Sequence, residues 1–246
     1  HLKVLGYVRS LVKINLILMN IFRLKCYYLT YNNSFLILAP FKLEQLYIDP
    51  DINMVHDVMN DNEIQHFMDE GKLTMARATD VHTGQNMMYR IAKIAWFNPA
   101  HSAIMNRVSK RMAHFSACDM TWAEELQIGN YGIGGHYSAH YDLAFTEVLN
   151  VKGYGNRYAT ILVYLSDVAS GGATVFVKLG MTVPVKKGAA IFWRNLLPTG
   201  EGDPKTLHAA CPVILGNKWV VNRWVREAGQ EFTALCTDDQ NKSKAC

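Results

Sequence analysis

The sequence predicts an α+β fold in which a β-sandwich or barrel is supported by helices that precede it. Two observations indicate this. After Trp122 the chain consists of short runs rich in β-branched and aromatic residues, with turn signals such as Ser170-Gly171-Gly172 and Gly216-Asn217 between them. Before Trp122, two stretches are typical of helices instead. Many short strands with helices only before them favour a sandwich or barrel.

The composition is that of an ordinary globular protein. The chain has 246 residues, of which 50% are apolar and 19% charged. That length is sufficient to bury a core, and the composition excludes a disordered, collagen-like or coiled-coil chain. Five cysteines are too few for a disulfide scaffold. We divide the chain into a basic, apolar leader over residues 1–40 and one domain over residues 41–246.

The net charge of +4 originates in the leader. Six basic residues precede the first acidic residue, Glu44. Because the excess belongs to one short segment, it does not indicate a nucleic-acid partner. Residues 11–22 are apolar but contain Lys13, Asn15 and Asn20, so they are too short and too polar for a membrane span.

Two helices are expected ahead of the strands. Residues 62–75 form the first. Asn98-Pro99 marks a turn, after which residues 101–116 form the second. This second stretch carries an apolar stripe at near-helical spacing, which we interpret as its buried face. The stripe consists of Ile104, Val108, Met112 and Phe115.

The expected strands follow in order, each bounded by glycine, proline or asparagine. The predicted strands cover residues 125–131, 158–165, 173–177, 188–194, 208–215 and 218–225.

A candidate metal site begins with His140-Tyr141-Asp142. In a strand, residues i and i+2 point to the same face, so this imidazole and carboxylate can reach one ion. The pair alone is a weak signal, and the strand that begins at His208 offers a third ligand. Two histidines and one carboxylate form the facial triad of non-haem Fe(II) oxygenases, which leaves open coordination positions.

Lys218 is the second anchor of the candidate site. It lies across the Gly216-Asn217 turn from the strand at His208 and is followed by Trp219, Val220 and Val221. A lysine in such a run is seldom buried without an anionic partner. A dicarboxylate that chelates the metal at one end and meets Lys218 at the other would supply that partner. The alternative is a solvated lysine at a turn.

At this point the sequence resembles the 2-oxoglutarate-dependent prolyl 4-hydroxylases, and among them the catalytic α subunits of the animal collagen-modifying enzymes. The resemblance rests on five strings in this order: AEELQIGNYGIGGHYSAHYD (123–142), GNRYATILVYLSDVASGGATVF (155–176), KKGAAIFWRNL (186–196), GEGDPKTLHAACPV (200–213) and GNKWVVNRW (216–224). It extends upstream with weaker likeness to about Arg23.

The resemblance implies a double-stranded β-helix (jelly-roll or cupin-like) core. It implies that Fe(II) is held by His140, Asp142 and His208. Lys218 should bind the distal carboxylate of 2-oxoglutarate, assisted by Tyr131 and Thr174. The family's peptide-binding positions correspond to Tyr137, Arg157 and Trp224. An aromatic-lined groove suits a proline-rich peptide in an extended conformation. The alternative places Trp224 in the core and Arg157 in an ion pair.

The implied reaction consumes O2 and 2-oxoglutarate and converts peptidyl proline, in collagen-like Xaa-Pro-Gly repeats, to 4-hydroxyproline, with L-ascorbate as the rescuing reductant. Alternatives are a prolyl hydroxylase of another secreted substrate and a non-catalytic β domain that serves in assembly. Collagen lysyl hydroxylases resemble the chain less, because their anchor is arginine where this chain has Lys218. The chain departs from the family at Arg226, where the α subunits usually have a histidine that handles 2-oxoglutarate.

The family resemblance also implies a compartment and a partner. Cys211 and Cys236 match an intrachain disulfide of the family, and such a bridge fits the lumen of the endoplasmic reticulum. In the family, the partner subunit is protein disulfide isomerase. Five free cysteines in a cytosolic enzyme are the alternative.

Overall fold

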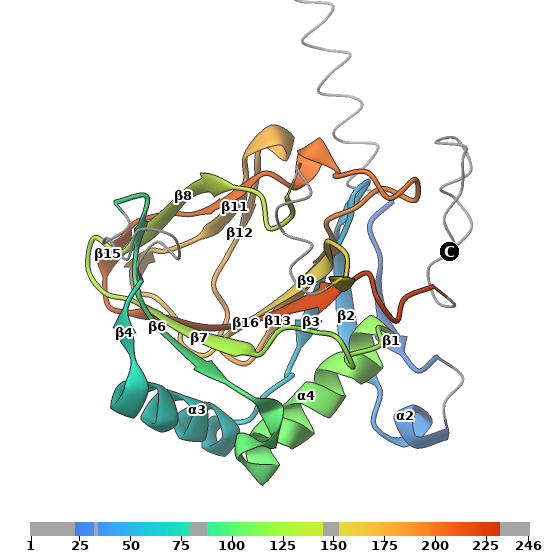
Figure 1. Cartoon of the computed structure of the whole chain (residues 1–246), viewed down its shortest axis with the longest axis horizontal. Helices are drawn as coiled ribbons and strands as arrows, with labels where there is room; N and C mark the ends of the chain where they lie inside the picture. Colours follow the sequence, from blue (N-terminus) through green and yellow to red (C-terminus); the bar gives the residue numbers. More distant parts are fainter. Residues whose placement is uncertain (1–22, 32–33, 79–87, 145–152, 232–246) are drawn as a thin grey trace, which may run out of the picture.

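Two antiparallel sheets face one another and form the body of the molecule (Figure 1). The computed structural model describes residues 23–31, 34–78, 88–144 and 153–231. Nine strands form the larger sheet, in the spatial order β1 (Cys26–Leu29), β2 (Phe41–Ile48), β3 (Asp51–His56), β13 (Ala190–Arg194), β9 (Arg157–Tyr164), β16 (Lys218–Arg226), β7 (Leu126–Tyr131), β6 (Lys93–Phe97) and β4 (Ala76–Arg77).

The smaller sheet covers one face of the larger one. Its five strands follow the order β12 (Met181–Val183), β11 (Thr174–Phe176), β14 (His208–Ala210), β8 (His136–His140) and β5 (Arg90–Ile91). A two-stranded sheet joins β10 (Ser170–Gly171) to β15 (Val213–Leu215). This arrangement confirms the predicted double-stranded β-helix core.

Helices cover the other face of the nine-stranded sheet (Figure 1). The described helices are α2 (Ser34–Leu38), α3 (Asp61–Thr74) and α4 (Ala103–Ser116), with 3-10 turns at η1 (Pro99–His101), η4 (Val177–Leu179) and η5 (Pro204–Thr206). One apolar core lies between these helices and the sheet and includes Phe67, Met112 and Ile161. A second core lies between the two sheets and includes Phe176 and Trp193.

Strand β16 serves both cores through its period of two. Trp219, Val221 and Val225 pack in the helix-covered core. Lys218 and Trp224, on the alternate positions, line the pocket between the sheets. The strand pairs with β9 on one side and β7 on the other, so both neighbouring strands set its register.

Both predicted helices are confirmed within two residues. Helix α3 begins after Asn60, whose side chain accepts a hydrogen bond from the Glu63 backbone while the Glu63 side chain bonds the Asn60 backbone. Helix α4 begins after Ser102, whose hydroxyl accepts from the Met105 backbone. The first residues of the predicted second helix belong to the 3-10 turn η1 instead.

The prediction of one strand over residues 208–215 is wrong. The segment forms two strands, β14 and β15, which belong to different sheets. The break falls at Cys211-Pro212, because proline has no N–H to continue a ladder and its carbonyl accepts from the Gly172 backbone.

The described α-helices precede the predicted strands, as expected, but the sequence analysis missed strands that lie ahead of and between them. Strands β2 and β3 form a hairpin ahead of α3, and β6 lies between α3 and α4. The alternating apolar residues of FKLEQLYI and the Asp49-Pro50 turn were available as signals for this hairpin.

Part of the leader, residues 1–40, belongs to the nine-stranded sheet. Strand β1, at residues 26–29, pairs with β2, so this part of the leader extends the nine-stranded sheet. Residues 1–22 lie outside the described residues, and the division at residue 40 stays a prediction. No helix in the described part of the chain is long and apolar enough to cross a membrane.

Replacing Phe67 with alanine is expected to cost about 3–5 kcal/mol in the free energy of unfolding. This side chain is fully buried where α3 packs on the sheet, so truncation leaves a cavity. Urea unfolding of the variant measures the loss, and Phe67→Leu serves as the matched control with a smaller cost. A loss below about 1 kcal/mol for Phe67→Ala would mean that α3 contributes little to the core.

Candidate metal centre

Three potential metal ligands meet where β8 ends and β14 begins. His140 closes β8, Asp142 follows two residues later, and His208 opens β14. The antiparallel ladder places His208 directly opposite His140. One ligand atom from each of the three side chains lies within 4.8 Å of the others. The structure therefore brings together the set that the sequence proposes.

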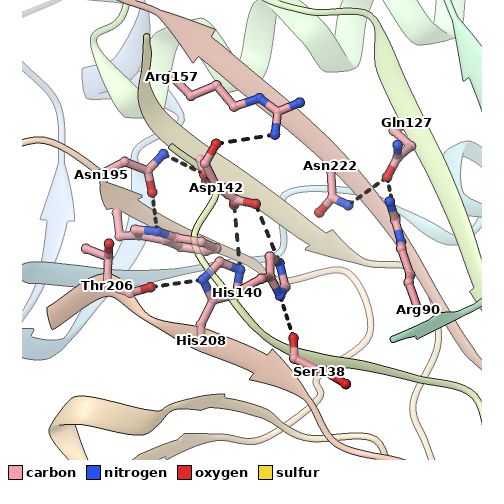
Figure 2. Close-up of polar contacts among 12 residues, drawn as sticks. Arg90, Gln127, Ser138, His140, Asp142, Arg157, Asn195, Thr206, His208 and Asn222 are labelled. Atoms are coloured by element: carbon pink, nitrogen blue, oxygen red, sulfur yellow. Dashed lines mark hydrogen bonds and ion pairs between the residues drawn. The ribbon is translucent and has the colours of Figure 1, made fainter. Parts of the chain in front are cut away.

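The carboxylate of Asp142 lies between the two imidazoles (Figure 2). Its Oδ1 is 3.6 Å from Nε2 of His140, and its Oδ2 is 3.6 Å from Nε2 of His208. The far nitrogen of each ring is engaged elsewhere: Nδ1 of His140 lies 2.8 Å from the Ser138 carbonyl and Nδ1 of His208 lies 3.0 Å from the Thr206 carbonyl. Because a carbonyl only accepts, each Nδ1 donates, and each Nε2 is left facing Asp142 as the nitrogen available to a metal.

Burial and charge set the protonation of this cluster. Burial opposes ionisation of Asp142, but the charges of His208 and His140 and a hydrogen bond from His140 hold the pKa of its carboxyl below the ordinary value. Burial lowers the pKa of His208 to about 4. A metal binds histidine through a deprotonated ring nitrogen, and a carboxylate with two such nitrogens is a donor set that suits a divalent metal. Two imidazoles and one carboxylate fit Fe(II) with open positions.

Lys218 lies in the pocket that contains the triad, on the wall formed by β16. Its side chain is buried, and its Nζ donates to Thr174 Oγ1 at 3.3 Å. Burial lowers the pKa of Lys218 to about 8. Tyr131 lines the same pocket, with its ring centroid 5.8 Å from the ammonium. Among the residues that the structure describes, no acidic side chain forms an ion pair with Lys218. The pocket therefore contains a buried positive charge without an anionic partner from these residues.

Of the three residues predicted to contact peptide, two line the pocket and the third packs against one of them. Tyr137 lines it and stacks on His140, with ring centroids 3.5 Å apart. Trp224 lines it as well, and the guanidinium of Arg157 lies 4.0 Å from the Trp224 ring centroid. Arg157 itself is paired with Glu124 through two hydrogen bonds of 2.6 and 2.7 Å.

Arg226, the departure from the family pattern, is held by the same carboxylate. Its Nη2 lies 2.7 Å from Glu124 Oε1, and its Nη1 donates to the Gly155 carbonyl at 3.0 Å. Glu124 thus binds two arginines, and one of them, Arg157, also donates to the Asp142 carbonyl at 3.3 Å. Glu124, Arg157 and Arg226 thus form a charged cluster beside Trp224.

Sequence reasoning missed a second polar group on the pocket side of the sheet. Arg90 donates to Gln127 Oε1 at 2.5 Å, and Asn222 donates to the same oxygen at 3.3 Å (Figure 2). A signal existed for Asn222, which stands four residues after Lys218 and so shares its face of the strand. Arg90 offers no local signal, because only the pairing of β5 with β8 brings it to the site.

The predicted disulfide falls partly outside the described residues, since these end at residue 231. Cys211 is half-buried at the break between β14 and β15. Its pairing with Cys236 stays a prediction.

Residues 126–226 match the 2OG-Fe(II) oxygenase superfamily. The chain is 45% identical over 223 residues to prolyl 4-hydroxylase subunit alpha-1 of Rattus norvegicus, covering 87% of this chain and 42% of that protein. It is 44% identical over 221 residues to subunit alpha-2 of Caenorhabditis elegans, covering 87% and 41%. The chain thus spans about two-fifths of the length of these relatives.

A solved structure shares the fold. The viral collagen prolyl hydroxylase of Paramecium Bursaria Chlorella virus-1, in its 2OG complex, superposes with a TM-score of 0.58 at 26% identity, covering 71% of this chain and 95% of that one. A Pseudomonas putida prolyl-4-hydroxylase shares the fold at 15% identity with a TM-score of 0.52. The chain is a homologue of the prolyl 4-hydroxylase alpha subunits, with a 2OG-Fe(II) oxygenase domain in its C-terminal region.

Proposed function

We propose that this chain is a 2-oxoglutarate- and Fe(II)-dependent dioxygenase that converts peptidyl proline to 4-hydroxyproline in collagen-like Xaa-Pro-Gly repeats. The observation that carries the proposal is one pocket containing both the His140–Asp142–His208 cluster and the buried cation of Lys218. A dicarboxylate spans such a pair of groups. The identity to named alpha subunits supports proline as the hydroxylated residue.

The chain's residues have distinct roles in this reaction. Nε2 of His140, Nε2 of His208 and the Asp142 carboxylate hold Fe(II), which supplies O2 activation coupled to decarboxylation of the co-substrate. Lys218 and Thr174 bind the distal carboxylate, and the apolar wall formed with Leu162 excludes water from it. One oxygen atom enters succinate, with release of CO2, and the other enters proline.

The peptide is proposed to lie against Tyr137 and Trp224. Both rings are on the pocket wall, and aromatic surfaces suit the flat, stiff rings of a proline-rich segment. The Arg157 guanidinium packs over the Trp224 ring, and Glu124 holds Arg157 in turn through an ion pair. The arginine at position 226 extends this charged cluster, so its contact with peptide or co-substrate differs from that of the family's histidine.

A single assay tests the proposal. The full chain is incubated with Fe(II), ascorbate and labelled 2-oxoglutarate, with and without a (Pro-Pro-Gly) repeat peptide, and CO2 and 4-hydroxyproline are quantified. We expect peptide-dependent CO2 release matched by hydroxyproline. Stimulation only by other proline-rich peptides would indicate a different secreted substrate. No turnover by protein that is folded and binds metal would favour a non-catalytic assembly role.

We further propose that the chain works in the lumen of the endoplasmic reticulum with protein disulfide isomerase as its partner and ascorbate as its reductant. The family resemblance supports all three, and the naming of the relatives as subunits supports the presence of a partner chain. The Cys211–Cys236 bridge belongs to the same proposal. Co-purification with protein disulfide isomerase after co-expression, and peptide mapping under non-reducing conditions, test the partner and the bridge.

Binding of 2-oxoglutarate is expected to weaken as the pH rises through about 8. Burial lowers the pKa of Lys218 to about 8, so its ammonium is lost at a pH where an ordinary lysine stays charged. Above that pH, binding of the dianion must take up a proton, and the Kd should rise about tenfold per pH unit. Equilibrium binding between pH 7 and 9.5 measures this. Lys218→Arg should flatten the profile, and a flat wild-type profile contradicts the prediction.

A further inference from the structure

A chain of buried hydrogen bonds runs from Asp142 into the core through three residues outside the predicted site. Thr160 Oγ1 lies 2.8 Å from Asp142 Oδ2, Asn195 Nδ2 lies 2.9 Å from Thr160 Oγ1, and Trp193 Nε1 lies 2.8 Å from Asn195 Oδ1. Figure 2 labels Asp142, at one end of this polar path, and Asn195, in its middle. Thr160, Asn195 and Trp193 are at most 1% exposed, so water does not replace their partners.

The donor and acceptor groups of the three side chains fix the direction of each hydrogen bond along this path. The indole N–H of Trp193 only donates, so the oxygen of Asn195 faces it and the amide nitrogen of Asn195 faces Thr160. The Thr160 hydroxyl accepts from that amide, and its single hydrogen remains for Asp142. The last hydrogen bond of this path therefore needs an acceptor atom on Asp142. An ionised carboxylate accepts such a bond more strongly than a protonated carboxylic acid.

Trp193, at the far end of this path, also contacts His208. The indole of Trp193 meets the His208 ring edge-on, with centroids 5.0 Å apart and an interplanar angle of 69°. Phe176 packs against Trp193 in turn, with centroids 5.2 Å apart. The backbone N–H of Asn195 donates to the Tyr158 carbonyl at 2.7 Å, which ties the path to β9. Two of the three proposed ligands are thus supported by one buried unit.

We propose that Thr160, Asn195 and Trp193 are positioning residues that fix the Asp142 carboxylate relative to His208 before a metal binds. The inference rests on the proposed iron site. Hydrogen-bond partners behind metal ligands typically contribute 10–100-fold in metal affinity or activity, because they remove the cost of orienting the ligand when the ion arrives. None of the three has to touch the ion for this effect.

The test is an equilibrium titration of the full chain with Co(II), followed by the visible absorption of the bound ion. Thr160→Val removes the hydroxyl at nearly constant volume, and Thr160→Ser retains it. We expect Thr160→Val to weaken Co(II) binding about 10–100-fold and to change the absorption spectrum. Thr160→Ser should remain within about threefold of the wild type. Ser116→Ala is the matched control, since it removes a buried hydroxyl that bonds the Met112 carbonyl within α4.

Trp193→Phe gives an independent arm, because it keeps an aromatic ring against His208 and removes the N–H that orients Asn195, together with part of the buried ring volume. It should also weaken Co(II) binding and alter the spectrum. Equal affinity and identical spectra for Thr160→Val and Thr160→Ser would overturn the proposal, as would a loss in Thr160→Val no larger than in Ser116→Ala. If the wild type itself bound neither Co(II) nor Fe(II), the result would instead contradict the proposed function on which the inference rests.

Discussion

Replacing Asp142 with asparagine is expected to weaken Fe(II) or Co(II) binding by at least about 100-fold and to reduce turnover to background. The carboxylate supplies the only negative charge among the three proposed ligands, and both imidazoles face it at 3.6 Å. Loss of a direct ligand should exceed the effect of losing a partner behind one, which is about 10–100-fold. Metal titration and single-turnover assays measure the two quantities separately.

The matched control is Asp119→Asn. Asp119 accepts a hydrogen bond from the Thr121 backbone in the turn after α4, away from the pocket. It should leave metal affinity unchanged. Retention of wild-type affinity by Asp142→Asn would mean that the metal is held by another set of residues, and the proposed function would then lose its central support.

Replacing Lys218 with methionine is expected to raise the Kd of 2-oxoglutarate by about 100-fold while metal affinity changes little. Truncating one member of a buried charge pair costs about 2–5 kcal/mol, and Lys218 is the buried cation of this pocket that we propose as the partner of the co-substrate. The variant without ligands should be no less stable than the wild type, because it no longer buries an unpaired ammonium. Isothermal titration with 2-oxoglutarate on the Co(II)-loaded protein measures the shift.

Lys187→Met is the control for loss of a lysine. Lys187 pairs with Asp61 at 2.7 Å on the surface, so its removal should not alter co-substrate binding. An equal loss of metal and 2-oxoglutarate affinity in Lys218→Met would show that the variant disturbs the whole pocket. The assignment of Lys218 as the anchor would then be withdrawn.

The parts of the site that sequence reasoning located are those fixed by short spacing or by a single turn. His140 and Asp142 lie two residues apart at the end of β8, and Lys218 opens β16 directly after the Gly216-Asn217 turn, a short distance along the chain from His208. The sheet pairing of His208 with His140 then completes the set. The register of that pairing is a long-range property, and the sequence supported it only through the family resemblance.

The parts that remained hidden depend on contacts between distant segments. Thr160 lies in β9 and Asn195 directly after β13, and only the pairing of these two strands places them side by side. An asparagine after a strand and a threonine within one are ordinary residues at such positions, so nothing in the sequence distinguishes them. The break at Pro212 was visible as a proline, but which sheet each half joins depends on tertiary packing.

Strand β16 leaves little room for insertions or deletions. Its odd and even positions serve different neighbours: Trp219 and Val221 pack under the helices, while Lys218 and Trp224 face the pocket. A shift of one residue would exchange these two sets, placing an ammonium in an apolar core and an indole where the co-substrate binds. Length changes that shift this strand should therefore be far less tolerated than substitutions on its pocket face, and an evolving or engineered chain can alter this pocket more readily by exchanging side chains than by inserting or deleting residues.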